Sequence, residues 1–214
     1  MGRRGPAPLR LAIALAIAIV LGVVAGVVGH LVLRPSAAAT APPLPDLHGQ
    51  ATWVAGERPA PAFTLRDVLG GTRSLASTRG HVTLVVFLDS RCRTLCPIVG
   101  RDLGDVQRSV SSAERPVVLV VSVDPAGDTA TSVRSAVRRW RIEPGWHWLT
   151  GTHRQLAAVW RSYGIEVKQT THDIVHGSAV YLLDPKGDER SGYLAPLLPN
   201  FIALDIRRVA GESS

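Results

Sequence analysis

The chain has 214 residues, with 24 Lys and Arg against 17 Asp and Glu, and a formal net charge of +7. Four basic residues flank an apolar stretch near the N-terminus, at positions 3, 4, 10 and 34, which leaves 20 basic against 17 acidic residues elsewhere. Because aromatic residues do not interleave these scattered charges, we expect no nucleic-acid-binding surface. The two cysteines are too few for a small fold held together by several disulfides.

The apolar stretch covers residues 11–33 and contains one His and no formally charged residue. An α-helix of this length, at about 1.5 Å per residue, crosses a hydrocarbon layer of about 30 Å. Three arginines precede it and one closely follows, so we expect residues 1–10 to be cytoplasmic and the C-terminal part to lie outside the cytoplasm. The small residues at 37–41 would suit a signal peptidase, but the stretch exceeds a signal-peptide core of roughly 7–15 residues. The sequence therefore favours a single-pass anchor in the cell membrane over cleavage.

Two further regions follow the apolar stretch. Residues 34–59 are rich in Pro and Ala, which predicts a semi-extended linker without a core of its own. Residues 60–214 show no second change of composition and no internal repeat, so we predict one domain there. Its roughly 155 residues are enough to bury a core without disulfide support.

Within this domain, the spacing of apolar residues alternates between the periods of strands and helices. Extended segments are expected at 63–65, 73–75, 81–88 and 116–123, residues 148–151 lead into a further helix, and a hairpin is expected from 179–183 and 190–194. Helices are expected over 95–110, after Thr129 as N-cap, over 156–163 and over 201–209. The alternation predicts an α/β fold of thioredoxin-like layout, a mixed central sheet flanked by helices with a terminal hairpin at an antiparallel edge.

Cys92 and Cys96 lie between the apolar strand predicted at 81–88 and the first long helix. Open α/β sheets place their ligands at the carboxyl ends of central strands. Pro97 suits an early helical position, so we expect Cys96 in the first turn, Cys92 in the loop or first turn, and both sulfurs on one side.

This position favours ionised thiols. The N-terminus of the helix supplies partial positive charge, and Arg91 and Arg93 add full charges beside the cysteines. We therefore predict a lowered pKa for at least one of the two thiols.

Two thiolates form a soft ligand set that suits Cu(I) or Zn, and a third ligand is sought among the histidines. His176 precedes the hairpin strand 179–183, and His172 lies four residues earlier, so their loop can approach the cysteines across the end of the domain. His153 is expected at a helix N-terminus, and His147 lies between two tryptophans. The residues alone leave the choice of histidine open.

Several short motifs, taken together, resemble those of a known protein family. In chain order they are Cys92-x-x-x-Cys96-Pro97 after residues 85–87, then 121–125 with Asp128 and Thr129, then 149–151, and then His176 before 181–187. This ordered set, spanning roughly residues 61–209, resembles the SCO/SenC family of copper-binding assembly factors. The resemblance implies a thioredoxin fold and copper held by Cys92, Cys96 and His176. It also implies delivery of copper to, or thiol reduction of, the dinuclear copper site of cytochrome c oxidase subunit II.

Other interpretations remain open. His172 is the substitute ligand, because Val175 and Gly177 depart from the residues that the family commonly has beside its histidine. The cysteines could instead form a structural disulfide, or serve a membrane-anchored thiol:disulfide oxidoreductase, with the usual pair having two intervening residues rather than three. Residues 61–67 also resemble the peroxiredoxins, in which a Thr precedes the reactive cysteine as Thr94 precedes Cys96. We expect a copper metallochaperone, with a copper donor or a thiol reductant as further partner, rather than a turnover enzyme.

Overall fold

The computed structural model describes residue 17 and residues 19–23, 46–170 and 173–212. The chain divides into two compact units, Met1–Pro42 and Pro43–Ser214. In the first unit, residue 17 and residues 19–23 are helical, while the rest of the predicted span 11–33 and all of segment 1–10 lie outside the described residues. Over the described ranges, no helix combines the length and the apolar character needed to cross a bilayer.

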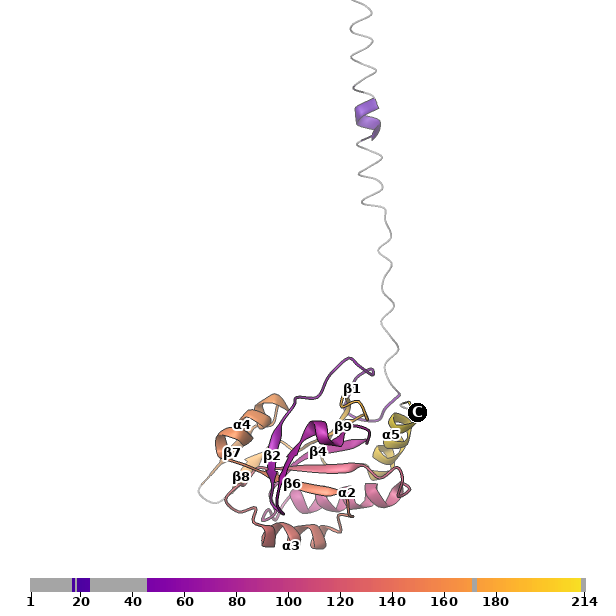
Figure 1. The fold of residues 1–214 in the computed structure, drawn as a ribbon. Helices are drawn as coiled ribbons and strands as arrows, with labels where there is room; N and C mark the ends of the chain where they lie inside the picture. The colour runs from indigo at the N-terminus through magenta and orange to yellow at the C-terminus, as the bar shows by residue number, and fades with distance from the viewer. Residues whose placement is uncertain (1–16, 18, 24–45, 171–172, 213–214) are drawn as a thin grey trace, which may run out of the picture. The chain divides into compact units, whose positions relative to one another are not determined.

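The second unit is built on an eight-stranded mixed sheet with the spatial order β1-β10-β9-β4-β5-β6-β2-β3 (Figure 1). The strands are β1 (Ala51–Thr52), β2 (Thr64–Asp67), β3 (Thr72–Ser74), β4 (Thr83–Leu88), β5 (Val117–Ser122), β6 (Trp146–Thr150), β9 (Ala179–Leu183) and β10 (Glu189–Leu194). A separate antiparallel hairpin consists of β7 (Val167–Gln169) and β8 (Ile174–His176). Strands β4, β5 and β6 are parallel, and the other pairings in the large sheet are antiparallel.

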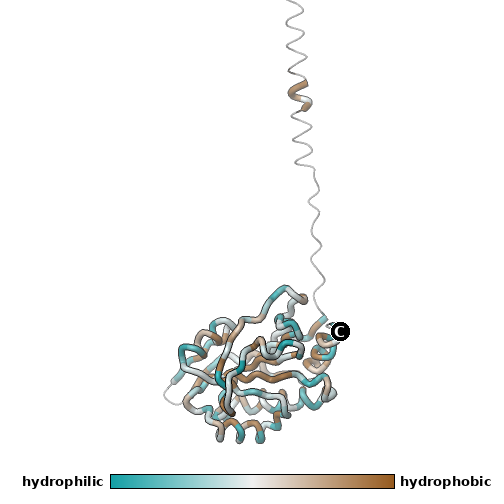
Figure 2. The backbone as a smooth tube through the Cα atoms, in the orientation of Figure 1, coloured by the Kyte–Doolittle hydropathy of each residue, from teal (hydrophilic) through white to brown (hydrophobic). Residues whose placement is uncertain are grey.

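Helices cover both faces of this sheet and bury two apolar clusters. They are η1 (Leu75–Thr78), α2 (Cys96–Ser109), α3 (Ala130–Trp140), α4 (His153–Ser162) and α5 (Pro199–Gly211). Side chains of α2, α3 and α5 pack on one face, and those of α4 pack on the other. Figure 2 shows hydrophobic residues along the central strands, and β4 is buried along its whole length. The predicted mixed α/β sheet flanked by helices is confirmed.

Local sequence explains where the helices begin. Thr129 accepts a hydrogen bond from the backbone N–H of Ser132, and the Ser132 side chain accepts one from the backbone N–H of Thr129. This reciprocal capping box satisfies donors at the start of α3, as expected for Thr129. Thr152 and Gln155 form the same arrangement at the start of α4.

The folded domain begins before the boundary at residue 60 that the composition predicted. β1 pairs with β10, and the His48 ring stacks on Phe201 and lies 2.6 Å from the buried carboxylate of Asp205. Residues 46–59, assigned to the predicted linker 34–59, therefore pack against the sheet. Because β1 adds to β10, the predicted terminal hairpin is also not the edge of the sheet.

Helix α2, which carries Cys96, approaches α3 through two buried glycines. A Cβ atom at Gly100 would collide with the ring of Trp140, and one at Gly104 would collide with the backbone carbonyl of Arg141. The missing side chains let the two helices lie close together and thereby fix the position of the cysteine end of α2.

We expect Gly104→Ala to lower the free energy of unfolding by roughly 1–3 kcal/mol more than Gly211→Ala does. Both glycines lie in helices, but a Cβ at Gly211 meets no atom within 4 Å. The difference between the variants, measured by urea unfolding, therefore isolates the steric conflict. Equal stability of the two variants would show that α2 and α3 can separate without cost.

Candidate metal centre

The two cysteines lie where β4 passes into α2, as predicted. Cys96 is the first residue of α2 and is buried, and Pro97 follows it. Cys92 lies in the preceding turn, is partly buried, and donates its backbone N–H to the carbonyl of Asp89 at 3.3 Å. Both thiols are free, so the structure holds no disulfide between them.

His176 reaches this pair from the end of β8. Its Nε2 atom lies 3.6 Å from the sulfur of Cys96, although the residues are 80 positions apart in the chain. Its Nδ1 atom lies 2.9 Å from the carbonyl oxygen of Gly177, which can only accept, so Nδ1 carries the proton. In the neutral ring, Nε2 then presents its lone pair to Cys96. His172, the substitute candidate, lies outside the described residues.

The thiols differ in their tendency to ionise. A hydrogen bond from Cys96, together with one from the Thr94 hydroxyl at 3.5 Å, lowers the pKa of Cys92 to about 4 against the cost of burial. The same hydrogen bond to Cys92, together with burial, raises the pKa of Cys96. The directions of the two shifts agree with the predicted lowering for one thiol, with Cys92 the more acidic of the pair. The Cys96 sulfur therefore has two polar neighbours, the Cys92 sulfur and Nε2 of His176.

The cause of this lowering differs in part from the expected one: the backbone N–H of Cys96, at the start of α2, contributes as expected, but the largest cause is the hydrogen bond with the Cys96 side chain, and neither Arg91 nor Arg93 is among the main causes. The Arg91 guanidinium pairs with Asp124 at 2.5 Å, and this carboxylate also accepts the backbone N–H of Gly127. Because the Asp124 carboxylate compensates the charge of Arg91, Arg91 does not act mainly on the cysteines. Thr94, considered for its place before Cys96, contacts Cys92 instead.

Two buried carboxylates behind the cysteine loop were not assigned a role from the sequence. Asp128 accepts hydrogen bonds from the backbone N–H of Ser90 at 2.9 Å, from Ser122 at 2.6 Å and from the Trp148 indole at 2.9 Å. It thereby ties the loop to β5 and β6. Burial raises the pKa of Asp89 to about 6, and this side chain accepts the backbone N–H of Arg91. Asp89 directly follows the buried strand β4, and this position is the pattern that could have indicated it.

The donor atoms suit a soft metal ion. Two cysteine sulfurs and an imidazole nitrogen are preferred by Cu(I) and Zn, and no carboxylate is needed. Cys96 and His176 already face each other, whereas in the described part of the chain no three His, Cys, Asp or Glu side chains are grouped closely enough to hold an ion. The assignment of Cys92, Cys96 and His176 as a complete ligand set therefore stays a prediction.

Other histidines contact other parts of the domain. His147 lies 2.9 Å from Asp67 and 3.1 Å from the Arg73 side chain. His153 is the first residue of α4, as expected, and its ring meets the edge of Trp160. Their side chains are engaged away from the cysteine loop.

Comparison with known proteins finds a family match over most of the folded domain. A family model described as SCO1/SenC matches residues 55–211. The mitochondrial SCO2 homolog of Bos taurus is 32% identical over 134 residues, which cover 58% of this chain and 50% of the bovine protein. The chain thus matches about half the length of that relative.

Solved structures show the same fold. The copper-bound structure of Bradyrhizobium japonicum ScoI has a TM-score of 0.61 and 26% identity, covering 70% of this chain and 98% of that one. The structure of BsSco, described as a member of the Sco family of cytochrome c oxidase assembly proteins with a disulfide switch, has a TM-score of 0.61 and 24% identity. The match covers 72% of this chain and 94% of BsSco.

Proposed function

Because the chain belongs to the SCO1/SenC family, we propose that it is a copper metallochaperone for cytochrome c oxidase. Cys92, Cys96 and His176 hold the copper ion, and the receiving site is the dinuclear copper site of oxidase subunit II. Copper is here the cargo, passed on by exchange of ligands with the cysteines of the partner. A copper donor, or a reductant of the two thiols, completes the cycle.

The contact between Cys96 and His176 carries this proposal. A histidine whose Nδ1 proton is held by the Gly177 carbonyl keeps Nε2 free for a metal, and Nε2 faces a cysteine sulfur at 3.6 Å. Cys92 supplies a second sulfur that is ionised at neutral pH. Binding of copper by Cys96 would require loss of its proton, so the metal affinity of the three donors should depend on pH.

A second candidate function is a thiol:disulfide oxidoreductase that uses the same cysteines without a stable metal. The observation that favours it is the opposite direction of the two pKa shifts, with Cys92 lowered and Cys96 raised. A partly buried acidic thiol beside a buried, less acidic one is the arrangement of an attacking and a resolving cysteine. In this function His176 would be dispensable for thiol exchange.

We further propose that residues 11–33 anchor the protein in the cell membrane, with the domain outside the cytoplasm. The support comes from the sequence: an uncharged apolar stretch of spanning length with its arginines mainly on the N-terminal side. Fusing a reporter enzyme that works only outside the cytoplasm to the C-terminus tests this orientation.

Titration of the reduced full-length chain in detergent with Cu(I), against a competing chelator, tests the metallochaperone function. We expect tight binding of one ion, lost in Cys92→Ser and in Cys96→Ser, because a hydroxyl is a poor ligand for Cu(I). The oxidised chain serves as the control and should not bind. Weak binding by every sample, together with a readily exchanged disulfide, would instead support the oxidoreductase.

A further inference from the structure

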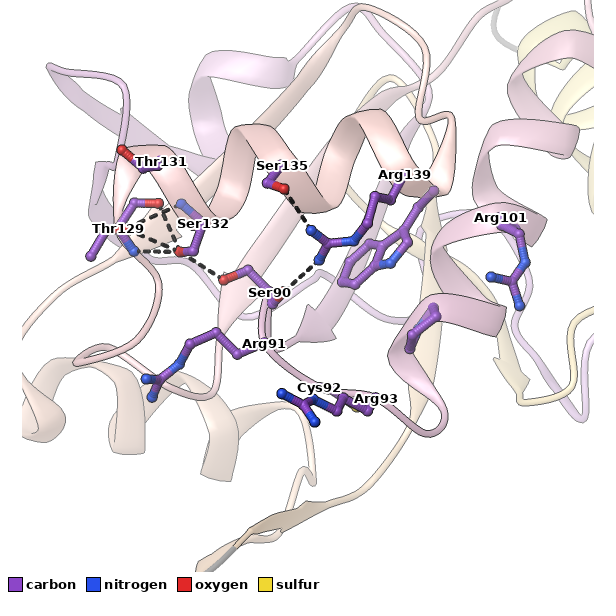
Figure 3. A pocket seen from close by; sticks show the side chains of 12 residues that line it. Ser90, Arg91, Cys92, Arg93, Arg101, Thr129, Thr131, Ser132, Ser135 and Arg139 are labelled. Carbon is purple, nitrogen blue, oxygen red and sulfur yellow. Dashed lines mark hydrogen bonds between the residues drawn. The ribbon is translucent and has the colours of Figure 1, made fainter.

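A surface groove of about 1040 Å³ opens beside Cys92. Figure 3 shows its walls, which come from the cysteine loop, from α2 and from α3. Its lining residues are Ser90, Arg91, Cys92, Arg93, Pro97, Arg101, Thr129, Thr131, Ser132, Ser135, Arg139 and Trp140. Four of them are arginines, several carry hydroxyl groups, and none is Asp or Glu.

The positive charge of this groove is largely uncompensated. Arg91 is paired with Asp124, but among the described residues Arg93, Arg101 and Arg139 form no ion pair with a carboxylate. All four arginines are exposed. The groove therefore presents net positive charge to a molecule that approaches Cys92 through it.

One arginine is held in place by neutral groups alone. Arg139 donates to the Ser135 hydroxyl at 2.5 Å and to the Ser90 carbonyl at 3.4 Å, as Figure 3 shows. These contacts orient the guanidinium without cancelling its charge, and its remaining donors can bind a carboxylate. The hydroxyls of Thr131 and Ser132 lie along the same wall.

We propose that this groove docks an acidic segment of the protein that exchanges copper or a disulfide with Cys92. The inference rests on the proposed function for the identity of that partner, and on the groove for its chemistry. Charges spread over a loop and two helices fit an extended chain of carboxylates better than a single small anion. Because Cys92 lines the groove, a segment bound there brings its own sulfur atoms close to Cys92.

Thiol exchange with two matched peptides tests the docking separately from copper binding. Each peptide carries a terminal cysteine bonded to thionitrobenzoate; one contains Asp and Glu, and the other Asn and Gln at the same positions. The Cys92 thiolate attacks the peptide sulfur, forms a peptide–Cys92 disulfide and releases thionitrobenzoate, which is followed by absorbance. With the full-length chain at low salt, we expect the acidic peptide to react about tenfold faster, with an advantage that falls as salt is added.

Arg101→Glu should abolish the faster reaction of the acidic peptide, because it reverses one positive charge of the groove. Arg101 lies in α2 and is not one of the cysteine-loop residues. Arg154→Glu is the matched control, since Arg154 is an exposed arginine of α4, on the other face of the sheet. It changes the net charge equally and should preserve the preference. Equal rates for both peptides, or equal losses in both variants, would overturn the proposal. Cu(I) affinity measured on the same samples separates this outcome from failure of the metal site.

Discussion

His176→Ala is expected to weaken Cu(I) binding by at least about 100-fold. Removing a residue that only orients a metal ligand costs about 10–100-fold in affinity, and loss of the ligand itself should cost more. Chelator competition on the full-length chain measures the affinity. The same variant should keep the rapid alkylation of Cys92, since the lowered pKa of that thiol depends first on Cys96. Loss of copper with retained thiol reactivity separates the metallochaperone from the oxidoreductase.

Two further histidine variants complete this experiment. His81→Ala is the matched control, because His81 is exposed and its side chain makes no hydrogen bond among those described. His172→Ala tests the substitute ligand. Full affinity in His176→Ala with a large loss in His172→Ala would transfer the ligand role to His172 and contradict the assignment made from the contact with Cys96.

The location of the cysteines could be predicted because it depends on local pattern. A continuous apolar strand, a short polar loop and a helix with Pro97 near its start place Cys96 at the first turn. The alternation of strands and helices likewise predicts the mixed sheet. These features depend on residues close together in the chain, where hydrophobic period and turn chemistry act directly.

The choice of histidine could not be derived in this way. His176 meets Cys96 only because β7 and β8 form a short hairpin, in which Val167 pairs with His176. Its strands are largely exposed, and Val175 points to solvent, so no buried apolar pattern marks them. The resemblance to a known family, rather than periodicity, singled out His176.

Long-range polar contacts explain the other differences. Arg91 was expected to act on the cysteines, but Asp124, 33 residues later, holds its guanidinium. The composition of residues 34–59 predicts a linker. In the structure, however, His48 contacts Asp205, and the backbone N–H of Trp53 donates to the carbonyl of Arg190 on β10. Such pairings depend on which loops the fold brings together, and composition does not record them.

Alkylation of Cys92 by iodoacetamide is expected to proceed at a nearly constant rate from pH 6 to pH 9, in contrast to that of an ordinary thiol, whose rate falls about tenfold per unit below a pKa near ~8.5. The reason is that hydrogen bonds from Cys96 and Thr94 lower the pKa of Cys92 to about 4. Cys96, buried and protonated, should react far more slowly. Mass spectrometry of the native full-length chain resolves the two sites.

Cys96→Ala provides the decisive comparison, because it removes the main donor to the Cys92 thiolate and should restore an alkylation rate that falls below about pH 8.

The lowered pKa of Cys92 also affects the stability of the fold. A thiol whose pKa is lower in the folded state stabilises the fold fully above its unfolded pKa, and this contribution is lost as pH falls towards about 4. The difference in unfolding free energy between wild type and Cys92→Ser should therefore shrink on acidification. A Cys92 rate that falls steeply below pH 8 in the wild type would show that Cys96 does not hold the thiolate, and would remove the support for both proposed functions that rests on an ionised Cys92.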